Sequence, residues 1–279
     1  MKKIITFSIL LLAISANSQE KVENQKKEWK KNGNITFLVN QSSFSNWIAG
    51  GDNTVSGNLG LNYDFNYVNG DLTWDNKLIF AYGINNVKGT GSRKTDDKFE
   101  FNSLVGKKAT GKWSYSFYVN FKTQLTNGYD YSQTPKEKTS AFLAPGYLSF
   151  GPGMLWKKSD SFKMNFSPLA SKLTIVSDEF SGKYGTDIGK NTRYELGFNA
   201  SLNHKTTLME NVTMENIVNF YSNYLENPLN LDVDYQLNFV MQINKYLSTN
   251  LNFHTIVDDN ATSKIQFKEV FGLGVNYLF

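Results

Sequence analysis

The sequence predicts an all-β protein: a transmembrane antiparallel up-and-down β-barrel of about 12 strands, with short periplasmic turns and longer outer loops. Three observations lead to this fold class. Apolar and polar residues alternate from Asn34 onward, which is the period of a strand with two different faces. The connections between these segments are alternately short and long. The chain ends on Phe279, in a segment where aromatic residues alternate with others.

The first residues predict a cleavable signal peptide. A basic start precedes an apolar segment, Ile4–Ile14, and the small residues Ala16 and Ser18 are placed for cleavage before Gln19. This apolar segment is too short to span a bilayer as a helix, which needs roughly 20 residues. We therefore expect an exported chain. Its expected parts are a signal peptide at 1–18, a polar N-terminal lead-in at 19–33 and a barrel at 34–279.

Composition excludes several classes of protein. The formal net charge is +4, and removing Lys2 and Lys3 with the signal peptide lowers it by two. A nearly neutral exported chain without a basic run argues against nucleic acid as a partner. The chain contains no cysteine, so neither a disulfide framework, a lipid anchor nor a thiolate metal site is expected. No cofactor is implied.

The strands follow one another with the same alternation. In the second, Leu59, Leu61 and Tyr63 share one face, whereas Asn62 and Asp64 lie on the other. The predicted strands lie at 34–41, 55–68, 72–84, 98–105, 113–125, 143–156, 162–176, 192–204, 212–220, 231–243, 247–257 and 264–279. The pair at 143–156 and 162–176 is less regular, because it contains three prolines.

The connections predict which strand ends face the same side. Asn69-Gly70 is a tight hairpin turn, since glycine readily adopts positive φ. Short connections fall near 68–71, 109–112, 157–161, 205–211 and 244–246. Longer polar connections fall near 85–97, 127–142 and 177–190, with smaller ones at 225–230 and 258–263. An even number of strands places both termini on the short-turn, periplasmic side.

A soluble β-sandwich would also alternate, but three features favour the barrel. The polar face is dominated by Asn, Ser, Thr and Gly, and the apolar face is repeatedly tipped with Tyr and Trp, as membrane interfaces require. Several strands are longer than the mean strand of about 5–6 residues and exceed the roughly 9–11 that cross a bilayer. A closed barrel also protects its own edges without disulfides.

Charged residues on the predicted inward face are the main candidates for function. One interpretation is a charged channel or a site for a polar ligand. The alternative is a narrow lumen filled by side chains that neutralise one another, and Tyr118 and Tyr221 favour such a plug. Asp232 and Asp234 point the same way and are candidates to hold a cation. The candidate lumen-lining residues are Asp64, Asp75, Lys77, Glu100, Lys122, Arg193, Glu195, Glu215, Asp232, Asp234, His254 and Lys268.

The segment after the first strand interrupts the alternation. Trp47, Gly50, Gly51 and Asn53 form a candidate rim cluster, in which the glycines supply the positive φ of a turn and Trp47 lies at the lipid–water boundary. The alternative is a rim site where the glycines let the backbone approach a ligand or partner. At the other end, Val275, Tyr277 and Phe279 are predicted to be the signal read by the barrel-insertion machinery.

A hydrolase is the weakest hypothesis. It would need a nucleophile, a histidine and an orienting residue within hydrogen-bond reach. Ser248, Asn250 and His254 are the available neighbours, but these residue types are common in this chain. A hydrogen-bonding histidine in the lumen is the simpler interpretation, and no catalytic residue is assigned.

The chain resembles a family of outer-membrane barrels of unknown function found in Bacteroidetes-type bacteria. The likeness is carried by Trp47, Gly50, Gly51, Asn53 and Ser56, together with the signal peptide and the terminal aromatic residue. It implies a fold and a location in the outer membrane of a Gram-negative bacterium. It implies no activity.

Three functions remain open at this point. The first is a passive pore or small-solute transporter, the second a non-conducting structural or interaction barrel of an outer-membrane assembly, and the third an outer-membrane hydrolase. The expected partners are outer-membrane lipid and the barrel-insertion machinery, with small polar solutes or other outer-membrane proteins as further candidates.

Overall fold

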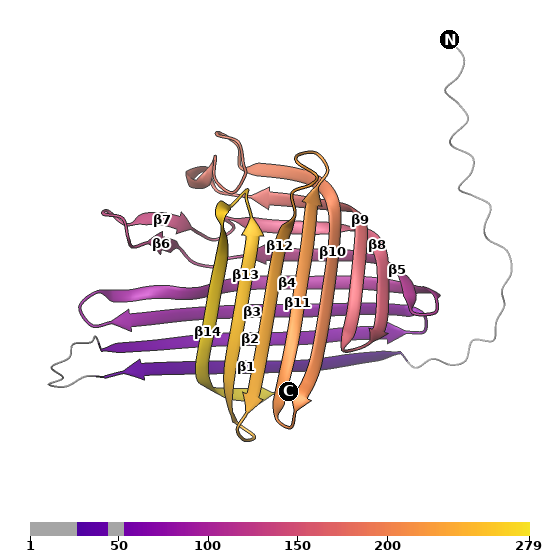
Figure 1. Cartoon of the computed structure of the whole chain (residues 1–279), viewed down its shortest axis with the longest axis horizontal. Coiled ribbons are helices and arrows are strands. Elements are labelled where there is room, and N and C mark those ends of the chain that lie inside the picture. Colours follow the sequence, from indigo (N-terminus) through magenta and orange to yellow (C-terminus); the bar gives the residue numbers. More distant parts are fainter. Residues whose placement is uncertain (1–26, 44–52) are drawn as a thin grey trace, which may run out of the picture.

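The computed structural model describes residues 27–43 and 53–279, and in them twelve antiparallel strands close into one barrel (Figure 1). The predicted fold class and strand number are confirmed, including the less regular middle pair. The barrel strands are β1 (Glu28–Ser42), β2 (Thr54–Asn69), β3 (Leu72–Val87), β4 (Gly91–Thr110), β5 (Trp113–Thr123), β8 (Gly146–Ser159), β9 (Phe162–Ile175), β10 (Thr192–Met209), β11 (Val212–Asn223), β12 (Asp232–Gln242), β13 (Leu247–Asp258) and β14 (Thr262–Leu278).

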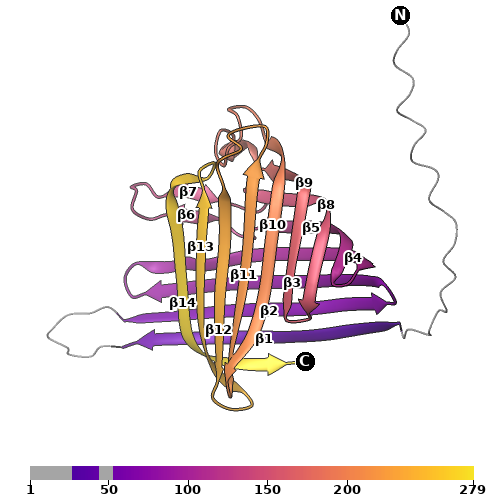
Figure 2. The same cartoon turned by 45° about the vertical axis from the view of Figure 1, so that its right-hand side comes forward.

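Each barrel strand pairs with the next one along the chain, and β1 pairs with β14 to close the circle. The short strands β6 (Gly128–Asp130) and β7 (Glu137–Ser140) form a separate hairpin, so β5 pairs directly with β8. In both views β1–β5 run across the molecule while β10–β14 cross in front of them (Figures 1 and 2). Such crossing of opposite walls is expected when the strands of a barrel are tilted against its axis.

The distribution of side chains is the reverse of that in a soluble protein. Among the described residues, eighteen buried side chains are polar or charged and only eight are hydrophobic. Large apolar side chains lie outside instead: Tyr115 is 65% exposed and Phe267 63%. The alternation therefore points apolar residues outward and polar residues into the lumen. Within the described part of the chain, no helix is long and apolar enough to cross a membrane.

The barrel closes where the first and last strands meet. Six residue pairs join β1 to β14, from Asn34 with Leu278 to Val39 with Leu273. Gly33 and Phe279 then exchange two backbone hydrogen bonds, of 2.8 and 3.0 Å. A Cβ atom at Gly33 would lie 2.3 Å from the Phe279 ring, so a larger residue there would require the ring to move.

β1 begins earlier than the sequence predicts. Residues 28–33, expected in the polar lead-in, pair with β2 from Glu28 with Val68 to Gly33 with Tyr63. Their composition is polar, but Trp29 packs against Tyr67 with ring centroids 5.1 Å apart. This pairing explains why a charged segment with one aromatic residue continues the strand.

The loop predicted over 85–97 is also wrong, because most of it is strand. β3 continues to Val87 and β4 starts at Gly91, so only residues 88–90 connect them. Asn85 pairs with Arg93 and Asn86 with Ser92. A run of polar residues is typical of a loop in the sequence. It is equally compatible with a hairpin that extends beyond the apolar belt of the barrel.

The prolines of the middle pair mark an irregular ladder. The pairing of β8 with β9 shifts between Phe150 and Met154, and that of β10 with β9 shifts between Gly197 and Asn199. Pro168 lies in this part of β9 and has no N–H group to donate. Ala170 therefore faces the lumen, although strict alternation from Asn165 would point it outward.

The longer connections gather at one end of the barrel, as predicted, and two of them form a cap. The cap consists of the β6–β7 hairpin with its flanks (residues 124–145) and the segment 176–191, which contains the short helix η1 (Asp178–Phe180). Phe180 is fully buried against Ala144 and Val176. The Tyr184 hydroxyl donates to the carbonyl of Thr139, and burial raises the pKa of Tyr184.

Several predicted features lie outside the described residues. These are the signal peptide at 1–18, the start of the lead-in, and Trp47, Gly50 and Gly51 of the rim cluster. Asn53 is described, and its carbonyl accepts a hydrogen bond of 3.0 Å from the backbone N–H of Lys88.

Candidate functional site in the barrel lumen

The inward faces of the strands enclose a cavity of about 860 Å³. Its lining extends from Asp160, in the short β8–β9 turn, to Ala261, in the β13–β14 connection at the opposite end. Side chains from all twelve barrel strands contribute to it. The cavity is therefore a feature of the whole lumen.

Hydrogen bonds cross this cavity from wall to wall. The Lys77 ammonium on β3 donates to Glu215 on β11 over 2.7 Å. Lys98 on β4 donates to Gln236 on β12 over 2.9 Å. In each case half of the twelve-strand circumference separates the two strands, so the partners come from opposite walls. The lumen is therefore bridged.

A second group of charges surrounds Asp234 on β12. Its carboxylate accepts from Lys122 on β5 over 2.6 Å and lies 2.9 Å from Nε2 of His254 on β13. Nearby, Glu100 pairs with Lys98 at 2.7 Å. Each acid therefore has its own cation, and the group joins two pairs of strands on nearly opposite walls.

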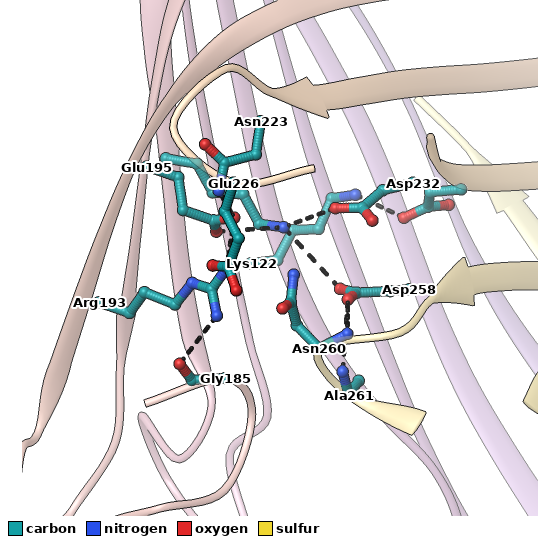
Figure 3. A network of polar contacts seen from close by, with 12 residues as sticks. Lys122, Gly185, Arg193, Glu195, Asn223, Glu226, Asp232, Asp258, Asn260 and Ala261 are labelled. Atoms are coloured by element: carbon teal, nitrogen blue, oxygen red, sulfur yellow. Dashed lines mark hydrogen bonds and ion pairs between the residues drawn. The ribbon is translucent and has the colours of Figure 1, made fainter. Parts of the chain in front are cut away.

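A third group lies toward the outer end and is centred on Lys172 of β9. Its ammonium lies 2.9 Å from Asp232, 3.5 Å from Glu195 and 3.8 Å from Asp258. Figure 3 shows these three acids converging from different strands, with Arg193 beside them. Arg193 donates to the Gly185 carbonyl over 3.0 Å, which ties this group to the cap.

Three further ion pairs involve residues that line the lumen. Asp75 on β3 lies 2.9 Å from Lys163 and 3.5 Å from Lys157. Lys268 on β14 pairs with Asp96 on β4 at 2.8 Å. These contacts again connect strands that are not neighbours in the barrel.

Between the charged groups lies a small apolar cluster. Tyr118 on β5 and Tyr221 on β11 pack together with Ala170 on β9, and Leu104 packs against them. The two tyrosines are 8% and 7% exposed, and neither hydroxyl has a hydrogen-bond partner among the described residues. A buried polar group without a partner typically costs about 1–3 kcal/mol. This pair is therefore one of the places in the described barrel where buried polar atoms lack a partner.

The structure brings the sequence-predicted lumen residues together inside the barrel. Ten of the twelve either line the cavity or, as Arg193 does, line a small pocket at its outer end. Glu100 and Glu195 are buried beside it, each only 1% exposed. The residues that line the cavity are Asp64, Asp75, Lys77, Lys122, Glu215, Asp232, Asp234, His254 and Lys268.

Sequence reasoning missed four of the cations that pair with these acids, Lys98, Lys157, Lys163 and Lys172. Lys98 and Lys163 lie at inward positions of segments in which polar and apolar residues alternate. Counting every second residue along these segments would have identified them. Lys172 could not, because the irregularity near Pro168 reverses the phase of β9 before it.

The two acids of the predicted cation site, Asp232 and Asp234, are both occupied by ion pairs. Each of these acids already has an ammonium partner, Lys172 or Lys122. Carboxylate oxygens of Asp232, Asp258 and Asp259 lie within 4.8 Å of one another, which is the spacing a metal ion requires. Lys172 contacts two of these three acids and supplies positive charge there.

The described residues do not assemble the serine–histidine pair of a hydrolase. His254 contacts Asp234. The hydroxyl of Ser248 instead accepts from Asn250 over 2.8 Å and from the side chain of Asn276. The serine is therefore held in a hydrogen-bond network of neutral groups.

A closed antiparallel barrel with a polar lumen and an apolar outer surface is the architecture of outer-membrane β-barrels. Residues 39–129, less than half of the chain, match the model of a protein family of unknown function, DUF3078. A comparison with curated proteins found no match.

Solved structures with a similar arrangement of strands are outer-membrane barrels. An outer membrane channel from Pseudomonas putida F1 shares 6% sequence identity over 94% of this chain and 99% of its own, with a TM-score of 0.40. The translocator domain of the autotransporter NalP from Neisseria meningitidis shares 10% over 92% and 90%, with a TM-score of 0.36. The outer membrane channel DcaP of Acinetobacter baumannii shares 10% over 91% and 97%, with a TM-score of 0.34.

Proposed function

We propose that this protein is an outer-membrane barrel of a Gram-negative bacterium that passes small solutes through a lumen held narrow by ion pairs. One observation carries the proposal: a cavity of about 860 Å³, lined mostly by polar and charged residues, reaches from the short-turn end to the outer loops. Ligand-sized cavities in proteins have volumes of roughly 300–1,000 Å³. A solute of that size can therefore be accommodated inside the lumen.

The outer surface supports the membrane location. Phe117, Phe271 and Val275 are each about half exposed on the outside, where a soluble protein would carry polar residues. Contact with lipid removes this surface from water. Export through the predicted signal peptide and recognition of Val275, Tyr277 and Phe279 by the insertion machinery are parts of the same proposal.

The charges of the lumen favour solutes of no particular sign. Among the described residues that line the cavity, nine are lysines and eight are acids. Because the two signs nearly balance and many of them are paired, the lumen lacks the single-sign field that selects cations or anions. Polar solutes of low charge are the class that this lining suits best.

A second function, a non-conducting barrel of an outer-membrane assembly, is favoured by a different observation. The pairs Lys77–Glu215 and Lys122–Asp234 join opposite or nearly opposite walls at 2.7 and 2.6 Å. If these bridges never separate, the lumen is a structural core that solutes do not cross.

Single-channel conductance in planar lipid bilayers distinguishes the two functions. The refolded protein without residues 1–18 should show small discrete steps. Lys77→Met/Glu215→Gln removes one bridge without changing the net charge, so it should enlarge the steps by widening the lumen. As a matched control, Lys138→Met/Glu179→Gln removes an ion pair of the cap and should leave the conductance unchanged.

The opposite result is equally clear. If the wild type and the bridge variant both insert, resist heat denaturation as barrels do and remain electrically silent, the protein does not form a pore. The same variants should then be tested for the capture of other outer-membrane proteins.

A further inference from the structure

We propose that the outer part of β14 is a docking edge for an extended strand of another protein, one that carries a basic residue among apolar residues on its lipid side. The inference goes beyond the proposed function, because it holds for a pore and for a silent barrel alike, and it rests only on the outer-membrane location. It is carried by a strand edge without a ladder partner, by the apolar surface beside that edge and by an acid on this surface that has no counter-charge.

The barrel wall is incomplete where β1 and β14 separate. Their ladder ends at Val39 with Leu273, and the side-chain amide of Asn40 then donates to the Phe271 carbonyl over 3.2 Å. Beyond this contact, residues 266–270 pair with β13 on one side and with no described residue on the side of β1. In both views β14 runs upward while β1 runs across the picture, so the two strands diverge (Figures 1 and 2). We call residues 266–270 the free edge of β14.

The exposure of the lumen-facing side chains changes where the ladder ends. On the paired part of β14, Gly272, Gly274 and Asn276 are buried. On the free edge, Lys268 is half-buried and Gln266 is exposed. Both of these residues also line the lumen cavity. The free edge is therefore an accessible border of the lumen, and a strand laid along it would complete the wall.

The outer face beside the free edge is apolar. Phe267 is 63% and Phe271 57% exposed, and Phe267 stacks against Phe253 of β13 with ring centroids 6.1 Å apart. Such a surface is typical of the lipid-facing side of a membrane barrel. Lipid forms no hydrogen bonds with backbone N–H and C=O groups, so an unpaired strand edge is strongly unfavourable there. A β-strand is the occupant that satisfies these groups and also continues the apolar face.

One acid on this face indicates the chemistry of the partner. Glu269 is exposed between Phe267 and Phe271, and it stands opposite Phe253 in the β13–β14 ladder. Its carboxylate has no ion-pair partner in the described part of the chain. A charge on the lipid-facing surface is costly, whereas a basic residue directly opposite on an adjacent strand would pair with it. We therefore expect the partner strand to place a lysine or arginine opposite Glu269.

The other face of the free edge demands no charge. Lys268 is already paired with Asp96 at 2.8 Å, and Gln266 is neutral. The partner strand is therefore expected to be polar and uncharged on its lumen side.

A second copy of this chain that presents the same edge does not supply the basic residue. Directly opposite residues of two paired strands lie on the same face of the sheet. The residues of β14 that share a face with Glu269 include no lysine or arginine; they are Ser263, Ile265, Phe267, Phe271, Leu273, Val275 and Tyr277. A different protein is therefore the better partner.

Disulfide capture of a designed peptide tests the docking edge, because the chain contains no cysteine of its own. The probe is a short peptide of alternating valine and threonine, with a cysteine placed opposite Gln266 and a lysine opposite Glu269. The refolded variant Gln266→Cys should capture it in detergent micelles, since opposite residues of adjacent strands come within reach of a disulfide. Asn252→Cys is the matched control, because Asn252 pairs on both sides, with Asn238 and Val270.

A second peptide, with glutamate in place of the lysine, measures the contribution of the charge. Gln266→Cys should capture it about fivefold less than the lysine peptide. Adding Glu269→Lys to Gln266→Cys should reverse this preference, and the heat resistance of the double variant shows whether it is folded. If the double variant does not fold, the comparison of the two peptides on Gln266→Cys still decides the point.

Three outcomes would overturn the proposal. The first is capture by Gln266→Cys that does not exceed capture by Asn252→Cys, and the second is equal capture of both peptides. The third is cross-linking of Gln266→Cys barrels to one another in preference to the peptide, which would make a second copy the occupant. Conductance of the same variants separates the docking edge from the pore. Ion steps without capture leave the pore and remove the docking edge, whereas capture without ion steps leaves the docking edge and removes the pore.

Discussion

The lumen and the cap both contain lysine–carboxylate ion pairs, but these pairs lie in different surroundings. In the lumen, Lys122 and Asp234 lie 2.6 Å apart and their side chains are 23% and 18% exposed. In the cap, Lys183 and Glu137 lie 2.7 Å apart with exposures of 46% and 57%. The distances are alike, but the surroundings are not. A pair screened by water contributes little, whereas an enclosed charge that loses its partner is strongly destabilising.

The cap is held by another force. Its two segments meet around Phe180, which is fully buried, so apolar contact and not charge fixes their position. The lumen has the opposite arrangement, with charged bridges around one small apolar cluster. The two regions therefore show that burial decides which contacts contribute most to stability: enclosed ion pairs in the lumen and apolar packing in the cap.

The largest effect is expected when one partner of a lumen pair is removed. Asp234→Leu leaves Lys122 and His254 without their carboxylate and should lower the free energy of unfolding by about 3 kcal/mol. Urea unfolding of the protein in lipid vesicles measures the change. Lys122→Met/Asp234→Leu removes both charges and should recover most of the loss. An unchanged stability of Asp234→Leu would mean that water solvates the lumen as well as it does the cap.

An effect of similar size, but confined to the cap, is expected from the apolar centre of the cap. Phe180→Ala opens a cavity against Ala144 and Val176 and should cost the cap about 3 kcal/mol, at the lower end for such substitutions. Limited proteolysis within 176–191 should speed up while the heat resistance of the barrel stays the same. Phe142→Ala is the control, because that ring is 59% exposed. Equal proteolysis of both variants would contradict the assigned role of Phe180.

The smallest effect is expected from an ion pair of the cap. Glu179→Gln removes the partner of Lys138, but Glu179 is half exposed, so the change in stability should stay below about 1 kcal/mol. The small effect should also fade in high salt, because salt screens exposed charges. A loss comparable to that of Asp234→Leu, seen in the same unfolding measurement, would remove the distinction between the two regions.

Much of the fold could be predicted from the sequence, because the side chains of a strand alternate between two faces of different polarity. This alternation appears in the sequence as a period of two residues. Asp64, Glu215 and His254 were placed in the lumen by counting along single strands. The phase of β9 was not predictable in this way, since the irregular pairing near Pro168 shifts Ala170 and Lys172 to the other face.

The pairings across the lumen could not be predicted from the sequence, for a different reason. Lys77 and Glu215 are 138 residues apart in sequence, and they meet only because the number and tilt of the strands place β3 opposite β11. No local pattern contains that information. The unsatisfied hydroxyls of Tyr118 and Tyr221 are hidden in the same way, since a missing partner is visible only when every neighbour is known.

The seam between β1 and β14 has a consequence for how fast the barrel can assemble. Other strands are joined by turns as short as Asn69 to Leu72, so their ladders form locally, whereas the seam must bring Asn34 to Leu278. Contacts between such distant residues carry the largest loop-closure entropy and form slowly. The seam should therefore form last and separate first. Until then the chain is an open, curled sheet, and the rate of its final step depends on six residue pairs and the two hydrogen bonds between Gly33 and Phe279.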